Sequence, residues 1–319
     1  MPRVLVTGGA GFIGSHVVRM TLSLGWDVTV LDNLTTGLKS TTDELVELGA
    51  TFKQGDIRDL ATVESCMESC DAVIHLAAQV SVPISIQRPE ETHEINIQGT
   101  ECVIKSAIKF NVKNLVMASS AAVYGEADSL PLGEDDAGDV LSPYATTKFY
   151  NETQILEART AGMNATALRF FNVYGDGQRP DGAYAAVIPK FVEMMAAGQP
   201  PSVFGDGEHT RDFIHVEDVS RAILNILNLS SEKNKHHVYN IATQSSVTLI
   251  QLIGAINSAL VEFQPTFTPL VANHLDEREG DIRHSMASIK RITTATDWTP
   301  QITFERGIKA QVKAYLGKM

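Results

Sequence analysis

The sequence lacks any apolar run of about 18 residues, the length that a membrane-spanning helix needs. Basic residues are also scarce, since 26 Lys and Arg stand against 38 Asp and Glu and give a formal net charge of -12. This acidic balance argues against a nucleic-acid partner, whereas a small phosphate-bearing ligand needs only a local cluster of cations. We therefore expect neither membrane association nor nucleic-acid binding.

Cysteine is equally sparse, with three residues in 319. Cys66, Cys70 and Cys102 show no paired C-x-x-C spacing, so neither a zinc site nor a disulfide framework is expected. They indicate free thiols in a reducing compartment. No basic, small-residue-terminated leader precedes the first apolar run, so secretion by a signal peptide is not expected. These observations predict a cytoplasmic protein without a metal site.

Short β-branched runs alternate with longer helical patterns through the first half of the chain. Such alternation predicts an α/β fold with a Rossmann-type doubly wound parallel sheet. After about residue 170 the sequence changes to loops rich in Gly, Pro and Asp. We expect one domain at 1–170 and a smaller α/β domain at 171–319, and a strand–helix–strand pattern at 211–240 leaves open a return to the main sheet. The expected strands are Val4–Val6, Val28–Leu31, Thr51–Gln54, Ala72–Leu76, Asn114–Ser119 and Ala165–Phe170.

A glycine-rich turn follows the first expected strand. Gly8, Gly11 and Gly14 give G-x-x-G-x-x-G, and counting from Gly9 also satisfies G-x-G-x-x-G. Either register permits a tight turn and a close approach of the backbone to a pyrophosphate at the start of the next helix. Asp32 ends the second strand, where a carboxylate would accept hydrogen bonds from an adenosine ribose and repel a ribose phosphate. The pattern favours NAD over NADP; an ordinary glycine turn with an unrelated acid downstream is the alternative.

Tyr144 and Lys148 stand four residues apart, on one face of a helix that Ser142-Pro143 starts. A tyrosine is a poor base near neutral pH, but a fixed positive charge nearby favours its phenolate. Ser119-Ser120 ends an apolar strand upstream, and a hydroxyl there can hydrogen-bond the substrate oxygen whose proton Tyr144 exchanges. These residues predict an acid/base pair, although Y-x-x-x-K alone also fits a solvated helix face.

Further motifs accompany these two and extend to about Arg283. The segments concerned are Thr7–Gly14, Asp32–Leu34, Gly55–Ile57, His75–Ala78, Ser119–Gly125, Tyr144–Lys148, Arg169–Gly175 and Arg211–Val219. In this combination the sequence resembles the NAD-dependent nucleotide-sugar epimerases and dehydratases, which are extended short-chain dehydrogenases. The resemblance implies that the first domain binds NAD and the second a nucleotide sugar.

The resemblance also implies individual roles around the cofactor. The expected catalytic residues are Ser120 at the sugar hydroxyl, Tyr144 as the acid/base and Lys148 on the nicotinamide ribose, whereas Ser119 is expected to be structural. Asp56 and Ile57 fall where the family holds the adenine. The expected NAD contacts are Gly8, Gly11, Phe12, Ile13, Gly14, Asp32, Asn33, Asp56, Ile57, Leu76, Ala77, Ala78, Asn96, Tyr144 and Lys148.

Substrate contacts are implied in the same way. Arg211 and Arg278 would clamp the diphosphate, because a planar guanidinium binds phosphate oxygens in pairs; a surface salt bridge is the alternative for each. Asn172 could instead cap its own turn. Phe204 fits either packing near the uracil or a core position. The expected substrate contacts are Ser120, Tyr144, Asn172, Phe204, Arg211, Arg278 and Ser285.

Ser285 falls where the family gates the space beside carbon 2 of the sugar. A bulky tyrosine there tends to confine relatives to unacetylated sugars, whereas a small residue leaves room for an N-acetyl group. Overpacking a filled site costs about 1–3 kcal/mol. The alternative is that Ser285 is a loop residue with no role at the sugar. An alignment with the family that is shifted by one residue would assign the gating position to His284 or Met286.

The reaction is suggested by two alanines that follow the strand hydroxyls. Dehydratases of the family usually carry an Asp-Glu pair at Ala121 and Ala122, and glucuronate decarboxylases usually carry a glutamate there. The resemblance thus implies epimerisation at carbon 4 of a UDP-hexose, UDP-glucose/UDP-galactose or the N-acetylated pair, through a transient 4-keto sugar. A UDP-glucuronate 4-epimerase or another nucleotide-sugar dehydratase or reductase is the alternative. A non-catalytic NAD-sensing regulator is an alternative of another class.

Two expectations concern surfaces. The resemblance and the apolar spacing of helices Ile95–Phe110 and Tyr144–Ala161 indicate a homodimer, although both apolar faces could equally be core. The acidic run Glu134-Asp135-Asp136 is expected to be a solvated loop.

Overall fold

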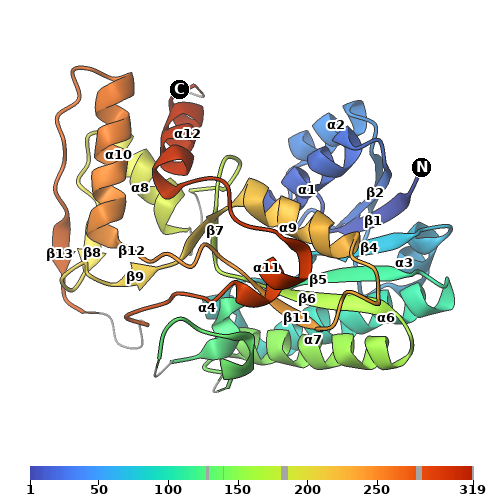
Figure 1. The fold of residues 1–319 in the computed structure, drawn as a ribbon. Coiled ribbons are helices and arrows are strands. Elements are labelled where there is room, and N and C mark those ends of the chain that lie inside the picture. Colours follow the sequence, from blue (N-terminus) through green and yellow to red (C-terminus); the bar gives the residue numbers. More distant parts are fainter. Residues whose placement is uncertain (127–128, 139, 181–185, 278–281, 318–319) are drawn as a thin grey trace.

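The computed structural model of the chain describes residues 1–126, 129–138, 140–180, 186–277 and 282–317. The molecule is built on a seven-stranded sheet in the order β11-β6-β5-β4-β1-β2-β3, with all neighbouring strands parallel (Figure 1). The predicted α/β fold with a doubly wound parallel sheet is therefore confirmed. The strands are β1 (Arg3–Thr7), β2 (Asp27–Asp32), β3 (Thr51–Gln54), β4 (Ala72–His75), β5 (Asn114–Ser120), β6 (Asn164–Phe170) and β11 (Val238–Ile241).

Each face of the sheet has its own apolar core, because successive side chains of a strand point to opposite faces. Val4 and Val6 of β1 belong to one core and Leu5 to the other. Figure 1 accordingly shows α1 and α9 on one side of the sheet and α6 and α7 on the other. The helices are α1 (Phe12–Ser23), α2 (Lys39–Glu47), α3 (Leu60–Met67), α6 (Gly99–Lys109), α7 (Pro143–Thr160) and α9 (Val216–Leu227).

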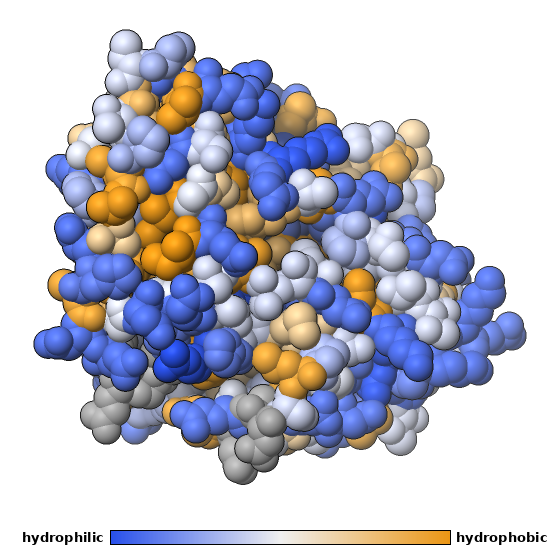
Figure 2. Space-filling view, turned by 60° about the vertical axis from the view of Figure 1, so that its left-hand side comes forward, coloured by the Kyte–Doolittle hydropathy of each residue, from blue (hydrophilic) through white to orange (hydrophobic). Residues whose placement is uncertain are grey.

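A second, smaller unit has a separate core in which Phe191, Leu252 and Ile308 are buried together. These side chains come from α8 (Val187–Ala196), α10 (Leu249–Phe263) and α12 (Phe304–Leu316). Figure 2 shows the side of the molecule that carries this unit, where apolar groups interrupt a largely hydrophilic surface. Its strand pairs are β7 (Asn172–Tyr174) with β10 (Phe213–His215), β9 (Thr210–Arg211) with β12 (Val247–Thr248), and β8 (Ser202–Phe204) with β13 (Asn273–Leu275).

The segment that follows β10 crosses back to the main sheet. Val219 and Ile223 of α9 pack into the same core as Val17 of α1. β11 then pairs with β6, with Val238 opposite Ala167. Residues beyond 170 thus complete the sheet, so a single cut there does not separate the two cores. The division into a cofactor domain and a substrate domain stays a prediction.

The strand order reverses between β1 and β4, since the chain builds outward from β1 in one direction and from β4 in the other. In open parallel sheets such a reversal opens a crevice at the carboxyl ends of the strands. No helix in the described ranges is long and apolar enough to cross a membrane. The remaining short elements are α4 (Val82–Gln87), α5 (Pro89–His93), the π-helix η1 (Glu94–Gln98), the 3₁₀ helices η2 (Ala121–Tyr124) and η3 (Glu134–Asp136), and α11 (Lys290–Thr296).

Candidate active site

The glycine turn lies at this crevice, between the ends of β1 and β4. Gly8 has φ +71°, and a Cβ atom there would lie 2.6 Å from the backbone nitrogen of Ala77. A Cβ atom at Gly14 would lie 2.1 Å from the carbonyl oxygen of Gly8. At Gly9 the obstacle is a side chain, Val30, at 2.8 Å. Backbone cannot move aside as a side chain can, so Gly8 and Gly14 are the positions where a side chain is excluded.

The N-terminus of α1 follows directly. Gly11 is the N-cap and supplies no capping side chain, and the first turn, which contains Phe12, Ile13 and Gly14, carries no acidic residue. The first N–H groups of this helix are thus left for an anion, as in dinucleotide-binding proteins. The ring of Phe12 packs edge-on against His16 at a centroid distance of 5.9 Å. This turn fits a pyrophosphate in both shape and charge.

Asp32 lies at the end of β2 beside this turn and is buried. Its carboxylate accepts hydrogen bonds from the backbone nitrogens of Ala10, at 3.0 Å, and Leu34, at 2.8 Å. Burial raises the pKa of Asp32 above its usual value, and the two backbone bonds oppose that shift. Each oxygen retains a further lone pair. Asp32 therefore holds the glycine turn through Ala10, a structural role that the sequence did not indicate, and its place at the ribose stays a prediction.

Asp56 and Ile57 follow β3, next to Asn33. Asn33 donates a 3.4 Å hydrogen bond to Asp56, and Arg58 donates one of 2.8 Å from its Nη2. The guanidinium of Arg58 lowers the pKa of Asp56 to about 2. Ile57 is buried, and a Cβ atom at Gly99 would lie 2.6 Å from its Cδ1. Arg58 thus fixes the Asp56 carboxylate, and no motif in the sequence indicated this residue.

The loop after β4, Leu76-Ala77-Ala78, is held by polar side chains beneath it. The backbone nitrogen of Ala77 donates to the Thr7 hydroxyl at 3.3 Å, and that oxygen lies 2.7 Å from Nδ1 of His75. Burial lowers the pKa of His75 to about 3, so this imidazole is neutral at physiological pH. The loop is thereby fixed against the glycine turn.

Asn96 lies in η1 and is buried. Its amide accepts from the backbone nitrogen of Gln79 at 2.8 Å and donates to the Gln79 carbonyl and the Thr147 hydroxyl, each at 3.0 Å. These contacts join the loop after β4 to α7. The protein itself thus engages both ends of the Asn96 amide, and we assign Asn96 to positioning the cofactor loop.

The acid/base candidates come together at the ends of β5 and α7. The Ser142 hydroxyl caps α7 by accepting from the backbone nitrogen of Ala145 at 3.1 Å, and Pro143 occupies the first turn. Tyr144 and Lys148 are both buried one turn apart. The side chain of Ser120 hydrogen-bonds the Tyr144 phenol. The predicted trio of Ser120, Tyr144 and Lys148 is therefore brought to one place.

The electrostatics of this trio follow from its burial. Burial raises the pKa of Tyr144, and the hydrogen bond from Ser120 lowers it in part. Burial lowers the pKa of Lys148 to about 8, and the nearby Glu152 carboxylate opposes the shift. The Lys148 ammonium donates to the carbonyl oxygen of Ala118 at 3.0 Å. A lysine so held can change its charge near neutral pH, which is unusual for this side chain.

The expected substrate residues lie in the smaller unit and at its junction with the sheet. Arg211, in β9, is half-buried and donates from Nη1 to the Thr210 carbonyl at 2.9 Å. The backbone nitrogen of Ser285 donates to the same carbonyl at 3.2 Å, so Ser285 lies beside Arg211. Phe204 ends β8 opposite Leu275, on a different strand pair. Arg278 lies outside the described residues.

Asn172 and Asp212 join the two units. The Asn172 amide donates to the carbonyl of Asp212 at 3.2 Å. The Asp212 carboxylate is fully buried and accepts four hydrogen bonds. They come from Thr243 N (2.8 Å) and Oγ1 (2.6 Å), Gln244 N (3.0 Å) and Ala287 N (3.3 Å). Asp212 thus anchors β9 and the 285–288 segment, a role that the Arg211-Asp212-Phe213 motif did not disclose.

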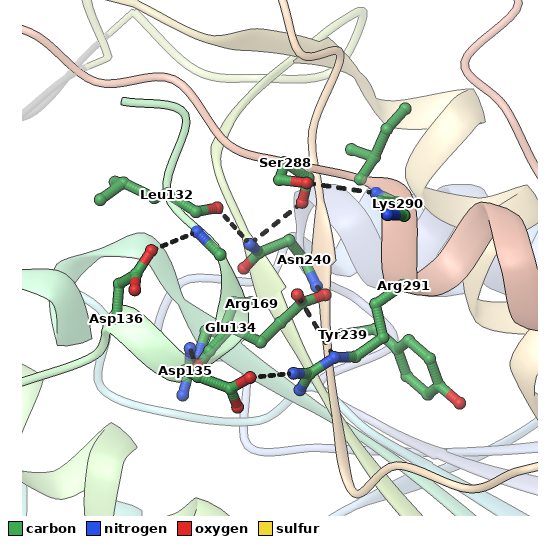
Figure 3. Close-up of polar contacts among 12 residues, drawn as sticks. Leu132, Glu134, Asp135, Asp136, Arg169, Tyr239, Asn240, Ser288, Lys290 and Arg291 are labelled. Carbon is green, nitrogen blue, oxygen red and sulfur yellow. Dashed lines mark hydrogen bonds and ion pairs between the residues drawn. The ribbon is translucent and has the colours of Figure 1, made fainter. Parts of the chain in front are cut away.

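The expectation of a solvated acidic loop at Glu134-Asp135-Asp136 is wrong for Glu134. That side chain is buried; it accepts from the backbone nitrogen of Asn240 at 2.9 Å and pairs with Arg291 at 3.4 Å (Figure 3). Asp135 remains exposed and pairs with the same arginine at 2.7 Å. Arg291 is 157 residues from Glu134 along the chain, so local sequence could not reveal the pairing.

A dinucleotide-type glycine turn and a buried Tyr–Lys pair with Ser120 beside it, at the same edge of a parallel sheet, define the class: a fold of the short-chain dehydrogenase kind. The comparisons agree. The model of the NAD dependent epimerase/dehydratase family matches residues 4–242. The chain belongs to that family.

Individual relatives cover nearly the whole chain. A UDP-glucose 4-epimerase from Lactobacillus helveticus is 33% identical over 317 residues, which is 94% of this chain and 92% of that protein. Among solved structures, a UDP-N-acetylglucosamine 4-epimerase from Methanobrevibacter ruminantium M1, in complex with UDP-N-acetylmuramic acid, matches with a TM-score of 0.91 and 35% identity over 100% and 99% of the two chains. A UDP-glucose 4-epimerase from Thermotoga maritima with UDP-glucose gives 0.89 and 33% over 99% of each.

Proposed function

We propose that this protein epimerises carbon 4 of a UDP-hexose, with NAD as cofactor, through a transient 4-keto sugar. The observation that carries the proposal is the hydrogen bond between half-buried Ser120 and buried Tyr144, one helical turn from Lys148, with Ala121 and Ala122 directly after Ser120. Neither alanine can transfer a proton, so Tyr144 is left as the acid/base group. Epimerisation at carbon 4 needs no second acid/base group, whereas dehydration does.

The residues present fit NAD. The backbone at Gly8 and Gly14 leaves no space for a Cβ atom, the start of α1 is uncapped by side chains, and Asp32 lies beside this turn, where the ribose is expected. When bound, NAD supplies reversible hydride transfer at the sugar carbon. The protein binds and orients this group, and its own side chains carry the proton.

Tyr144 takes the proton of the 4-hydroxyl and later returns it, while Ser120 hydrogen-bonds the same sugar oxygen. Lys148, when charged, favours the phenolate form of Tyr144. Arg211, with Arg278, would hold the diphosphate, because two guanidinium groups can grip its oxygens in pairs. A sugar anchored only through its diphosphate can turn and present its other face.

The substrate range is the finer part of the proposal. We assign UDP-glucose/UDP-galactose and, because Ser285 is small and lies beside Arg211, the N-acetylated pair as well. The similarity to a UDP-N-acetylglucosamine 4-epimerase supports this assignment. UDP-glucuronate 4-epimerisation, or a dehydratase or reductase reaction, is the alternative, and a non-catalytic NAD-sensing protein would turn over none of these sugars.

Two further properties belong to the proposal. A homodimer is supported by exposed apolar side chains on α7, where Phe149 is 41% and Leu156 47% exposed. Other residues of the two candidate helices, such as Ile104 and Ile155, are core. A cytoplasmic location is supported by the three unpaired thiols, which suit a reducing compartment.

The decisive experiment incubates the purified protein with UDP-glucose, UDP-galactose, their N-acetylated counterparts and UDP-glucuronate, and resolves the products by chromatography. The proposal requires interconversion of at least one UDP-hexose pair without net oxidation. Turnover of UDP-glucuronate alone would support a UDP-glucuronate 4-epimerase, and loss of water would support a dehydratase. No turnover of any sugar would support a non-catalytic NAD-sensing protein.

A further inference from the structure

A buried polar network joins β5, β6 and α7 next to the acid/base candidates. Arg169 of β6 lies at its centre, 3% exposed. Its Nε and Nη2 donate to the two carboxylate oxygens of Glu152 at 2.8 and 2.7 Å. Its Nη1 donates to the Tyr124 hydroxyl at 2.9 Å and to the Glu134 carbonyl at 2.7 Å. Four hydrogen bonds from one buried guanidinium fix its position closely.

One arm of the network leads to the acid/base group. Glu152 lies one turn after Lys148 on α7, and its carboxylate also accepts from the Ser119 hydroxyl at 2.6 Å. Ser119 precedes Ser120, which contacts Tyr144. Glu152 thus ties α7 to the end of β5 at the level of the catalytic trio, and Arg169 holds Glu152.

The other arm leads toward the diphosphate clamp. The Tyr124 hydroxyl donates to Oδ1 of Asn240 at 2.6 Å. The amide nitrogen of Asn240 donates to the carbonyls of Leu132, at 3.0 Å, and Ser288, at 3.2 Å (Figure 3). Leu132 pairs with the same segment, accepting from the nitrogen of Ser288 at 2.8 Å and donating to the carbonyl of Met286 at 2.9 Å.

The 286–288 segment completes the connection. The nitrogen of Ala287, between the two residues that Leu132 contacts, donates to the buried carboxylate of Asp212. Asp212 adjoins Arg211, and Ser285 pairs with Thr210. An unbroken series of contacts between buried and half-buried groups therefore joins Ser120, Tyr144 and Lys148 to the strand that carries Arg211.

We propose that Arg169, with Tyr124, is a positioning residue that sets the spacing between the acid/base group and the diphosphate clamp. The inference rests on the proposed epimerase function. A sugar that turns about its anchored diphosphate must present carbon 4 to Tyr144 from either face, so the distance from anchor to phenol governs the rate. Displacement of a reacting group by about 1 Å can cost roughly 100-fold in rate.

Each end of this connection also has its own local support. Lys148 and Tyr144 are held by α7, and Arg211 is held by the Asp212 contacts. Breaking the middle therefore leaves the clamp able to bind UDP and leaves NAD contacts intact, while the two ends lose their fixed separation. A lower kcat with nearly unchanged UDP affinity distinguishes this role from a general loss of folding.

The test uses Tyr124→Phe, which removes one oxygen and keeps the ring under the Arg169 guanidinium, at 4.9 Å. Its matched control is Tyr239→Phe, because the hydroxyl of this fully buried tyrosine bonds the amide oxygen of Asn234 at 2.9 Å, outside the network. Arg169→Lys is the stronger variant, with Arg159→Lys as control, since Arg159 donates to two carbonyls at 3.1 and 2.7 Å.

For Tyr124→Phe we expect kcat to fall about tenfold relative to Tyr239→Phe, with the Kd for UDP changed less than about twofold. In hydrogen-exchange measurements on the parent, added UDP should slow exchange both near Arg211 and in the α7 amides from Tyr144 to Glu152. In Tyr124→Phe only the protection near Arg211 should remain. Arg169→Lys should lower kcat further, again with a nearly unchanged Kd for UDP and with protection only near Arg211.

Equal kcat for the two tyrosine variants would overturn the inference, as would a loss of UDP affinity equal to the loss of kcat. UDP protection of α7 that survives in Tyr124→Phe would also overturn it. If Arg169→Lys does not fold, Tyr124→Phe decides the matter. A parent protein that epimerises no UDP-hexose refutes the proposed function instead, and the exchange measurement then still decides whether the two sites are connected.

Discussion

The ammonium group of Lys148 donates a 3.0 Å hydrogen bond to the carbonyl oxygen of Ala118, two residues before Ser120 on β5. This bond ties the helix that carries Tyr144 to the strand that carries its hydroxyl partner. Tyr144 and Lys148 lie one helical turn apart and are both buried, and this hydrogen bond of the Lys148 ammonium goes to a neutral carbonyl oxygen. The acid/base chemistry proposed above depends on this arrangement.

Tyr144→Phe should abolish turnover while NAD remains bound, because it removes one oxygen from a side chain whose ring stays packed. Loss of a general acid/base group costs roughly 100- to 10,000-fold in rate. Steady-state kinetics and the NAD content of the purified variant provide the measurement. Tyr150→Phe, on the same helix and 48% exposed, is the control. Activity of the Tyr144 variant within a few-fold of the parent would remove Tyr144 from its assigned role.

The stability of protein freed of NAD should depend on pH through Lys148. Burial lowers the pKa of this group from 10.5 to about 8, so the unfolded chain holds a proton that the folded chain has released between these values. The free energy of unfolding of the parent minus that of Lys148→Met should therefore be lowest and constant below about pH 8. It should rise between about pH 8 and pH 10.5. Urea unfolding at several pH values measures this. Lys105→Met, at an exposed site, should show no such rise.

Asp32 should determine cofactor selectivity. Its buried carboxylate ends β2, where we expect the ribose, and would oppose a phosphate there, so the parent should bind NAD more tightly than NADP by about tenfold or more. Asp32→Asn keeps the size of the side chain and removes its charge, so it should reduce the difference in affinity between NAD and NADP. Calorimetric titration with both cofactors tests this. Asp27→Asn, at the opposite end of β2, should leave the preference unchanged; equal affinity of the parent for both cofactors would refute the assignment.

The protein should be a dimer at micromolar concentration, with Phe149 and Leu156 at the contact. Two charges placed on that face should desolvate unfavourably and separate the copies, so Phe149→Glu with Leu156→Glu should halve the mass measured by light scattering. Leu24→Glu, at a 58% exposed site after α1, is the control. A monomeric mass for the parent would contradict the dimer.

Ser285→Tyr should reduce catalytic efficiency on UDP-N-acetylglucosamine far more than on UDP-glucose. A phenol ring beside Arg211 would fill the space that an acetamido group needs, and forcing both into one site costs about 1–3 kcal/mol, or roughly five- to 150-fold. The comparison uses both sugars on parent and variant, with Ser258→Tyr on the exposed side of α10 as control. If the parent ignores the acetylated sugar, or the tyrosine leaves its preference intact, Ser285 is no gate.

The sequence by itself determined the parallel sheet, the glycine turn and the shared helix face of Tyr144 and Lys148. These features depend on short-range patterns: strand alternation shows in four to seven residues, the glycines of the turn are spaced three residues apart, and Tyr144 and Lys148 lie one helical turn apart. The tertiary structure alone decided which charges are buried together. Arg169 meets Glu152, Glu134 meets Arg291, and Asp212 collects donors from segments 31 to 75 residues away. A buried charge is stable only with partners, and those partners come from chain segments that adjoin only after folding.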